Sequence, residues 1–197
     1  MRAPKLRELK EAVRALVVGP YTANFPAEPT PVPESFRGRP RFDEDECVGC
    51  GGCANVCPPG ALEKEDDLEA GVRRLTVHLD RCIFCGQCHA YCLTEKGIEQ
   101  TNEYDLSTTD RSTLLEEVEK ELLLCEACGA VIGAREHVLW VARRLGPLAF
   151  ANPTLMLTAL DDDGLADKEP PPSEELRRGD KLRVLCPKCR QITSLKA

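Results

Sequence analysis

The sequence lacks any long apolar run. No segment approaches the roughly 20 consecutive apolar residues that a membrane-spanning helix needs, and nothing at its start resembles a cleaved targeting segment. It also contains no nucleotide-binding loop and no plausible pair of nucleophile and base. We therefore expect a protein that is soluble or peripherally attached to a membrane, and that carries out no bond chemistry of its own.

The chain has little excess of positive charge anywhere outside its first segment, because acidic residues outnumber basic ones, 33 to 26. The formal net charge is −7, which argues against nucleic acid as a partner, because binding to nucleic acid depends on Lys and Arg that neutralise phosphates. The distribution is uneven, however, since residues 1–41 hold eight Lys and Arg against four Glu. This asymmetry predicts that the leading segment meets a different partner from the rest of the chain.

Cysteine, in contrast, is abundant, with 12 among 197 residues. Eight of them form two runs in which two, two and three residues separate successive cysteines: Cys47, Cys50, Cys53 and Cys57, then Cys82, Cys85, Cys88 and Cys92. This spacing is typical of [4Fe–4S] ligands, and in two-run ferredoxins the fourth cysteine binds the cluster of the other run. The sequence therefore predicts cluster one on Cys47, Cys50, Cys53 and Cys92, and cluster two on Cys82, Cys85, Cys88 and Cys57. A disulfide framework is the alternative, which the lack of a signal peptide disfavours.

The two runs belong to an internal repeat over residues 42–105. This repeat predicts a bacterial-type two-cluster ferredoxin-like domain over residues 42–106, in a protein of the α+β class. Each copy should contain a cysteine loop, a short helical turn and a strand. Residues 63–79 predict a hairpin between the copies, because apolar and polar residues alternate there. The copies differ after the last cysteine, where Pro58 in the first copy corresponds to Leu93 in the second.

The flanking segments suggest further elements. Residues 1–20 predict an amphipathic helix with a basic polar face, over Lys5 to Val18, that lies on a membrane surface or in a partner's groove; the alternative is packing on its own domain. Residues 21–41 are rich in proline and predict an extended arm. Residues 107–124 predict a connecting helix, from about Arg111 to Leu124, after a capping signal at residues 107–110.

The remaining cysteines form two CxxC pairs, Cys125 with Cys128 and Cys186 with Cys189. Two such pairs predict a closed structural zinc site with four sulfur ligands, and hence a zinc-ribbon-like domain over residues 125–197. Iron in a rubredoxin-like site and a dithiol redox pair are the alternatives. Within this domain we expect a helix near residues 135–145, an acidic loop over 161–173 and a strand at 182–185.

These features together resemble a known family. The basic leading helix, the arm that ends in Phe36-Arg37-Gly38-Arg39-Pro40, the two cysteine runs and the segment Asn102-Glu103-Tyr104-Asp105-Leu106-Ser107 are similar to the ferredoxin-like subunit I of respiratory complex I. The closing CxxC pairs depart from that subunit. They resemble its relative in formate hydrogenlyase and other membrane-bound, complex-I-related [NiFe] hydrogenases.

The resemblance implies an electron-transfer subunit that relays electrons through two [4Fe–4S] clusters to the small subunit of a hydrogenase. The input module would be a formate dehydrogenase, a CO dehydrogenase or a soluble ferredoxin, and nickel would sit on another polypeptide. The resemblance also implies that the leading helix lies along the membrane arm on the cytoplasmic side, and that the arm at residues 36–38 packs on the hydrogenase subunits. The alternatives are a quinone-reducing complex I assembly, a freely diffusing ferredoxin and a nucleic-acid-binding zinc-ribbon protein; acidic residues 161–163 argue against the last.

Overall fold

The computed structural model describes residues 5–19, 22–28, 30–165 and 182–195, and the chain divides into two units, 1–36 and 37–197. In the first unit, helix α1 runs from Leu6 to Val18, where the amphipathic pattern predicts a helix. Gly19 ends it with a φ of +86°, a conformation that glycine adopts without steric cost. None of the α1 residues is buried, and Leu6 and Leu16 are 86% and 87% exposed. The predicted arm contains no helix or strand among its described residues before Pro40.

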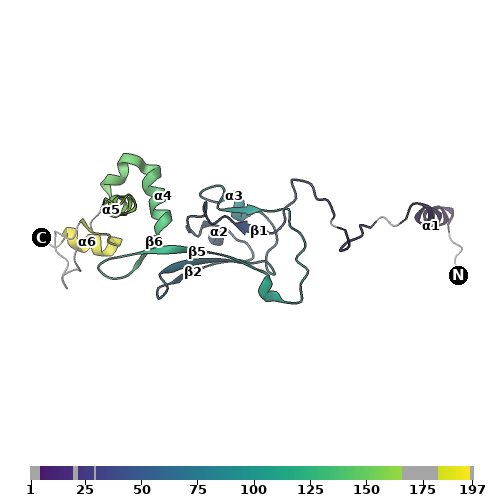
Figure 1. Cartoon of the computed structure of the whole chain (residues 1–197), viewed down its shortest axis with the longest axis horizontal. Coiled ribbons are helices and arrows are strands. Elements are labelled where there is room, and N and C mark those ends of the chain that lie inside the picture. Colours follow the sequence, from purple (N-terminus) through teal and green to yellow (C-terminus); the bar gives the residue numbers. More distant parts are fainter. Residues whose placement is uncertain (1–4, 20–21, 29, 166–181, 196–197) are drawn as a thin grey trace. The chain divides into compact units, whose positions relative to one another are not determined.

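The second unit is built on a four-stranded antiparallel sheet in the order β2-β3-β5-β6 (Figure 1). Strands β2 (Leu62–Asp67) and β3 (Val72–His78) form the hairpin that alternation predicts over residues 63–79. In β3 every second side chain is buried, and Leu75 and Val77 are 1% and 0% exposed. One face of this hairpin therefore packs against the hydrophobic core.

Strand β5 (Leu115–Leu124) corrects one prediction. The sequence predicts a helix over residues 111–124, but only Arg111–Thr113 are helical, as a 3-10 turn capped by the side chain of Asp110. The prediction relied on Leu114, Leu115, Val118 and Leu122, and all of these except Leu115 are spaced four residues apart. Because four is an even number, this spacing also puts side chains on one face of a strand. Pairing with all of β3 decided in favour of the strand.

Strand pairing crosses three of the predicted domain limits. Strand β5 pairs with β3 on one side and with β6 (Val131–Ala134) on the other, so one sheet extends across the predicted limits at 106/107 and 124/125. The end of the arm belongs to the ferredoxin unit, because β1 (Pro40–Phe42) pairs with β4 (Ile98–Gln100). Backbone hydrogen bonds from Gly38 and Arg39 to Thr101 and Glu103 continue this pairing.

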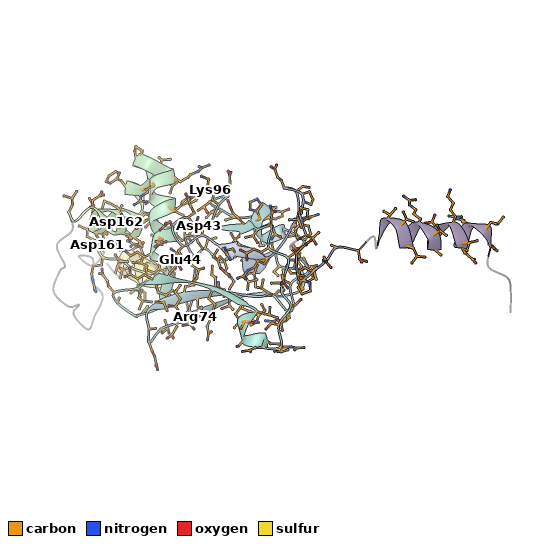
Figure 2. The ribbon with its side chains drawn as sticks, turned by 45° about the vertical axis from the view of Figure 1, so that its right-hand side comes forward. Asp43, Glu44, Arg74, Lys96, Asp161 and Asp162 are labelled. Carbon is orange, nitrogen blue, oxygen red and sulfur yellow. The ribbon has the colours of Figure 1, made fainter. Side chains whose placement is uncertain are left out.

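The C-terminal part is mainly helical. Helix α4 (Arg135–Leu145) lies where the sequence predicts it, followed by the 3-10 helix η2 (Gly146–Ala151) and by α5 (Pro153–Asp162). Asp161 and Asp162 (labelled in Figure 2), predicted to begin an acidic loop, instead end α5. Arg135 pairs with both carboxylates. Residues 166–173 of that loop lie outside the described part. The strand predicted at 182–185 is absent from the described residues 182–186, which are irregular and lead into α6 (Pro187–Leu195).

Candidate metal centres

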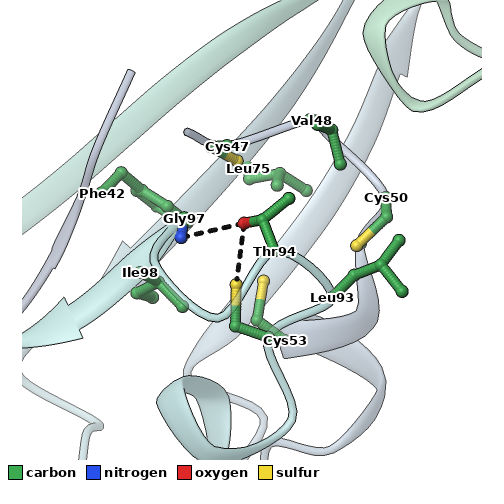
Figure 3. Close-up of a pocket in the computed structure, with 12 residues that line it drawn as sticks. Phe42, Cys47, Val48, Cys50, Cys53, Leu75, Leu93, Thr94, Gly97 and Ile98 are labelled. Carbon is green, nitrogen blue, oxygen red and sulfur yellow. Dashed lines mark hydrogen bonds between the residues drawn. The ribbon is translucent and has the colours of Figure 1, made fainter. Parts of the chain in front are cut away.

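The first cysteine run forms a loop that ends in the short helix α2 (Gly52–Asn55). Behind this loop lies a cavity with apolar walls from Phe42, Leu75 and Ile98 (Figure 3). Four cysteines line it, three from the first run and one from the second: Cys47, Cys50, Cys53 and Cys92. These are the four that the sequence predicts for cluster one. The fold has brought Cys92 to the first loop from about 40 residues further along the chain.

The second run repeats the arrangement with helix α3 (Gln87–Ala90). Its cavity is walled by Pro40, Leu62 and Val77, and four cysteines line it: Cys57, Cys82, Cys85 and Cys88. These are the four predicted for cluster two. Each cavity thus combines three cysteines of one run with the last cysteine of the other, as the crossed assignment requires.

The chemistry of both cavities fits an iron–sulfur group. None of the twelve cysteines, all of which are described, forms a disulfide. Cys53 and Cys88 are each 7% exposed. Burial, followed by the nearby thiols of Cys50 and Cys47, raises the pKa of Cys53 to about 12. Burial likewise raises the pKa of Cys88 to about 11, and the thiol of Cys82 adds to the increase. Burial therefore disfavours the thiolate forms of these cysteines, and the positive charge of iron would stabilise them.

Hydrogen-bond donors point at several of these sulfurs. In each loop a backbone amide lies 3.4 Å from a cysteine sulfur, from Gly52 to Cys50 and from Phe84 to Cys82. Two side chains add further contacts. Thr94 Oγ1 lies 3.5 Å from Cys92 Sγ, and Gln100 Nε2 lies 3.8 Å from Cys88 Sγ. Such bonds to sulfur are one of the factors that set cluster reduction potentials.

Sequence reasoning missed these side chains and two arginines. Arg73 donates to the carbonyl oxygen of Gly49 at 3.1 Å, and Arg37 donates to that of Cys85 at 2.9 Å. Arg37 therefore contacts the second cysteine loop of its own chain, whereas the resemblance implied that residues 36–38 pack on other subunits. An aligned comparison of the two repeat copies would have singled out Thr94, because the matching residue is Pro59. No local signal identifies the arginines, since their partners are distant in the sequence.

The third cysteine group is also brought together. Its members are Cys125, Cys128, Cys186 and Cys189, and their sulfur atoms all lie within 4.8 Å of one another. Cys128 is exposed and the other three are buried. Burial alone would raise the pKa of Cys125, but the backbone amides of Cys186, Ala127 and Cys128 lower it below the usual value. Four converging sulfurs are a donor set that suits one soft or borderline metal ion.

The surroundings of this group connect the sheet to the C-terminal helices. The amide of Glu126 donates to the carbonyl oxygen of Val184 at 3.0 Å, and Arg183 donates to both the side chain and the carbonyl of Glu126. The small buried cluster here consists of three of the cysteines and Leu185. The second CxxC lies at the start of α6 and not in a hairpin turn, so the zinc-ribbon prediction for this part is not supported by the fold.

The repeat, the two cysteine-lined cavities and their apolar walls define a dicluster ferredoxin-like protein. Residues 34–96 accordingly match the family model of the 4Fe–4S dicluster domain. Formate hydrogenlyase subunit 6 of Escherichia coli is 32% identical over 125 residues, which cover 64% of this chain and 69% of that protein. NADH-quinone oxidoreductase subunit I 2 of Geobacter metallireducens is 32% identical over 120 residues, covering 56% and 90%. The chain therefore belongs to the family that contains these two proteins, which confirms the resemblance.

A third relative is matched over a smaller share of its length. NAD(P)H-quinone oxidoreductase subunit I of Gloeobacter violaceus is 36% identical over 100 residues, which cover 48% of this chain and 47% of that protein. This chain thus spans about half the length of that relative. In the part of the chain that the structure describes, no helix combines the length and the hydropathy that crossing a membrane demands.

Proposed function

We propose that this protein relays electrons through two [4Fe–4S] clusters and has no catalytic centre of its own. Cluster one would be held by Cys47, Cys50, Cys53 and Cys92, and cluster two by Cys82, Cys85, Cys88 and Cys57. The observation that carries the proposal is the crossed composition of the two cavities, each lined by three cysteines of one run and the last cysteine of the other. When bound, such clusters supply one-electron transfer.

The proposed setting is a membrane-bound assembly of the [NiFe] hydrogenase or formate hydrogenlyase type. The chain would accept electrons from a dehydrogenase or ferredoxin module and pass them to the hydrogenase small subunit, with the large subunit and membrane arm nearby. The match to formate hydrogenlyase subunit 6, over 64% of this chain, supports this choice. A complex I or other quinone-reducing assembly is the second candidate, favoured by the quinone oxidoreductase relatives.

Helix α1 would provide peripheral contact with the cytoplasmic side of the membrane through residues 5–18. Its apolar residues Leu6, Val13 and Leu16 are all more than half exposed, and Arg7 and Lys10 contribute to a basic polar face. A helix of this kind can lie in the interface of an anionic bilayer. Co-sedimentation of the full chain with anionic vesicles, compared with a Leu16→Asp variant, tests this contact; equal sedimentation of both proteins would contradict it.

The third cysteine group would hold one structural zinc ion through Cys125, Cys128, Cys186 and Cys189, with iron as the lesser possibility. The closeness of the four sulfurs supports a single ion. Zinc has no redox chemistry, so its role would be to join the β5–β6 region to α6. Metal analysis of the purified protein distinguishes the two metals, because iron beyond that of two clusters, with no zinc, would favour the rubredoxin-like alternative.

The crossed ligand sets can be tested by single replacements in the full-length protein. Cys50→Ala and Cys92→Ala should remove or convert the same cluster, although the two residues are in different runs. Cys57→Ala and Cys85→Ala should both affect the other cluster. Electron paramagnetic resonance of the reduced protein, with iron and sulfide analysis, identifies which signal each variant loses. Cys128→Ala is the matched control and should leave both signals in place.

Two outcomes would contradict the relay proposal. If Cys92→Ala changed the same signal as Cys85→Ala, the crossed assignment would be wrong. If all four variants kept full iron content, these cysteines would not hold clusters at all. The setting is tested separately by purifying the chain from its native cells: copurification with nickel-containing subunits supports the hydrogenase type, and quinone-linked activity without hydrogenase activity supports the second candidate.

A further inference from the structure

The hydroxyl group of Thr94 lies between a backbone amide and a cysteine sulfur of the first cavity (Figure 3). Its Oγ1 accepts a hydrogen bond from the amide of Gly97 at 3.0 Å and lies 3.5 Å from Cys92 Sγ. Because the amide already donates to the oxygen, the hydroxyl's own hydrogen can be donated to the sulfur. The Gly97 amide, the Thr94 hydroxyl and the Cys92 sulfur therefore form a short chain of hydrogen bonds.

The backbone holds this hydroxyl closely in place. A Cβ atom at position 97 would lie 2.9 Å from Thr94 Oγ1, 3.0 Å from the Cα of Cys47 and 3.3 Å from Cys92 Sγ. Gly97 thus lets the turn close tightly over two of the four cysteines of the first cavity. The position of the Thr94 hydroxyl is consequently set by the main chain and not by a mobile neighbouring side chain.

Among the described residues that line the second cavity, none supplies an equivalent of this hydroxyl. In the aligned repeat, Thr94 follows Cys92 by two residues as Pro59 follows Cys57, and proline has neither a hydroxyl nor an amide hydrogen to donate. In the second cavity a side-chain donor is supplied by another residue, Gln100 in β4. Its Nε2 lies 3.8 Å from Cys88 Sγ, a longer distance than that of the Thr94 hydroxyl from Cys92 Sγ. The two cavities therefore receive chemically different donors on different ligands.

We propose that Thr94 is a positioning residue that raises the reduction potential of the cluster in the first cavity. The inference rests on the proposed function, since it assumes that a cluster is bound there. Reduction adds one electron and no proton, so the sulfurs become more negative. A hydrogen bond to sulfur stabilises that reduced form more than the oxidised form. Thr94 thereby makes the first site easier to reduce than it would be with an apolar residue, and separates its potential from that of the second site.

The test is a redox titration of the full-length, cluster-loaded protein, followed by electron paramagnetic resonance. Thr94→Val removes the hydroxyl at nearly constant volume, and Thr94→Ser retains it. Gln100→Leu removes the donor of the second cavity, and Thr76→Val removes a hydroxyl that bonds to Glu117 on the sheet surface, away from the cysteines. Iron and sulfide content is measured for every variant.

We expect Thr94→Val to lower the reduction equilibrium constant of one signal several-fold, up to about tenfold, which for a one-electron couple is about 59 mV. Thr94→Ser should restore the wild-type potential. Gln100→Leu should shift only the other signal, and Thr76→Val should shift neither. The signal that Thr94→Val moves should be the one lost in Cys50→Ala.

The inference is overturned if Thr94→Val keeps both clusters and both of its reduction potentials match those of the wild type. It is also overturned if the signal that shifts is not the one lost in Cys50→Ala, or if Thr94→Ser has the same potentials as Thr94→Val. If Thr94→Val loses iron, the reduction potentials of Thr94→Ala and Thr94→Ser are compared instead. A lower potential in Thr94→Ala with a wild-type potential in Thr94→Ser supports the inference, and equal potentials in the two variants reject it. Failure of the proposed function is distinguishable, because the wild-type protein would then contain no [4Fe–4S] signal to titrate.

Discussion

Arg73, in strand β3, donates from Nη1 to the carbonyl oxygen of Gly49 in the first cysteine loop, at 3.1 Å. The same guanidinium makes a bidentate interaction with Asp66, in which Nε donates to Oδ1 at 2.6 Å and Nη2 donates to Oδ2 at 2.9 Å. Its side chain is 8% exposed. The contact with Arg73 is also the main cause that keeps the pKa of Asp66 below its usual value. One buried side chain thus ties the β2–β3 hairpin to the loop that lines the first cavity.

Replacing this arginine should destabilise the first cysteine loop. Arg73→Leu removes the donors to Gly49 and Asp66, and the loss of hydrogen bonds to a charged, buried group costs about 1.5–3 kcal/mol. The rate at which visible absorbance is lost in the presence of a chelator measures the effect. Arg74→Leu is the control, because the neighbouring Arg74 (labelled in Figure 2) makes a surface ion pair with Glu119, and ion pairs of this exposed kind contribute little to stability. Equal rates of loss in the two variants would contradict the role of Arg73.

Gly49 should tolerate no side chain. Its φ is +67°, and an added Cβ would lie 2.9 Å from the Cβ atoms of both Lys120 and Ala134. Gly49→Ala therefore combines backbone strain with a collision against two strands. Gly71→Ala is the matched control, since Gly71 has a φ of +71° but nothing within 4 Å of the added atom.

We expect Gly71→Ala to cost about 1–2 kcal/mol from backbone strain alone, and Gly49→Ala to cost about 1–3 kcal/mol more from overpacking. Chemical denaturation monitored by circular dichroism compares them, and iron analysis shows whether the first cluster is retained. A Gly49→Ala variant no less stable than Gly71→Ala would mean that the loop can move away from β5 and β6.

The third cysteine group should be separable from the first two. Cys128→Ser is expected to lower the zinc content and loosen α6, because the buried residues around Leu185 are largely the cysteines themselves. Both electron paramagnetic resonance signals should persist, because these cysteines line neither of the two cavities. Hydrogen exchange measured by mass spectrometry should show faster exchange in residues 186–195 and unchanged protection in β2 and β3. Loss of iron without loss of zinc would show that this division of the cysteines is wrong.

Two threonines of α5 provide a further test of how the C-terminal part is held. Thr154 is 6% exposed, donates to the carbonyl of Leu185 at 2.9 Å and accepts from Arg190 at 2.5 Å. Thr158 is 1% exposed, but its hydroxyl bonds only to the carbonyl of Thr154 within the same helix, at 2.7 Å.

Thr154→Val should therefore cost about 1–3 kcal/mol. It leaves the carbonyl of the buried Leu185 without this donor and removes one of the acceptors of Arg190, which keeps its bond to the carbonyl of Arg183. Thr158→Val should cost clearly less, because the carbonyl of Thr154 keeps its place in the helix. Limited proteolysis of the C-terminal segment, with thermal unfolding, compares the two variants. Similar resistance in both proteins would indicate that the contact with Leu185 and Arg190 contributes little.

Local patterns predicted the elements in which neighbours along the chain decide the structure. The cysteine spacing, the turns α2 and α3, the alternation of the β2–β3 hairpin and the helical periodicity of α1 and α4 all belong to this group. Patterns compatible with two structures were misjudged, as for β5, where a four-residue spacing fits a helix and a strand equally. Helices α5 and α6 were not predicted.

From its amino acids alone, this chain determined which residues can bind metal and how the ligands divide into two repeats and a third group, because ligand spacing is a property of a few consecutive residues. Only the tertiary structure decided that Arg73 meets Gly49, that Arg37 meets Cys85 and that β5 joins two predicted domains into one sheet. Those contacts depend on the packing of segments 24 to 48 residues apart, and no local preference of either partner encodes them.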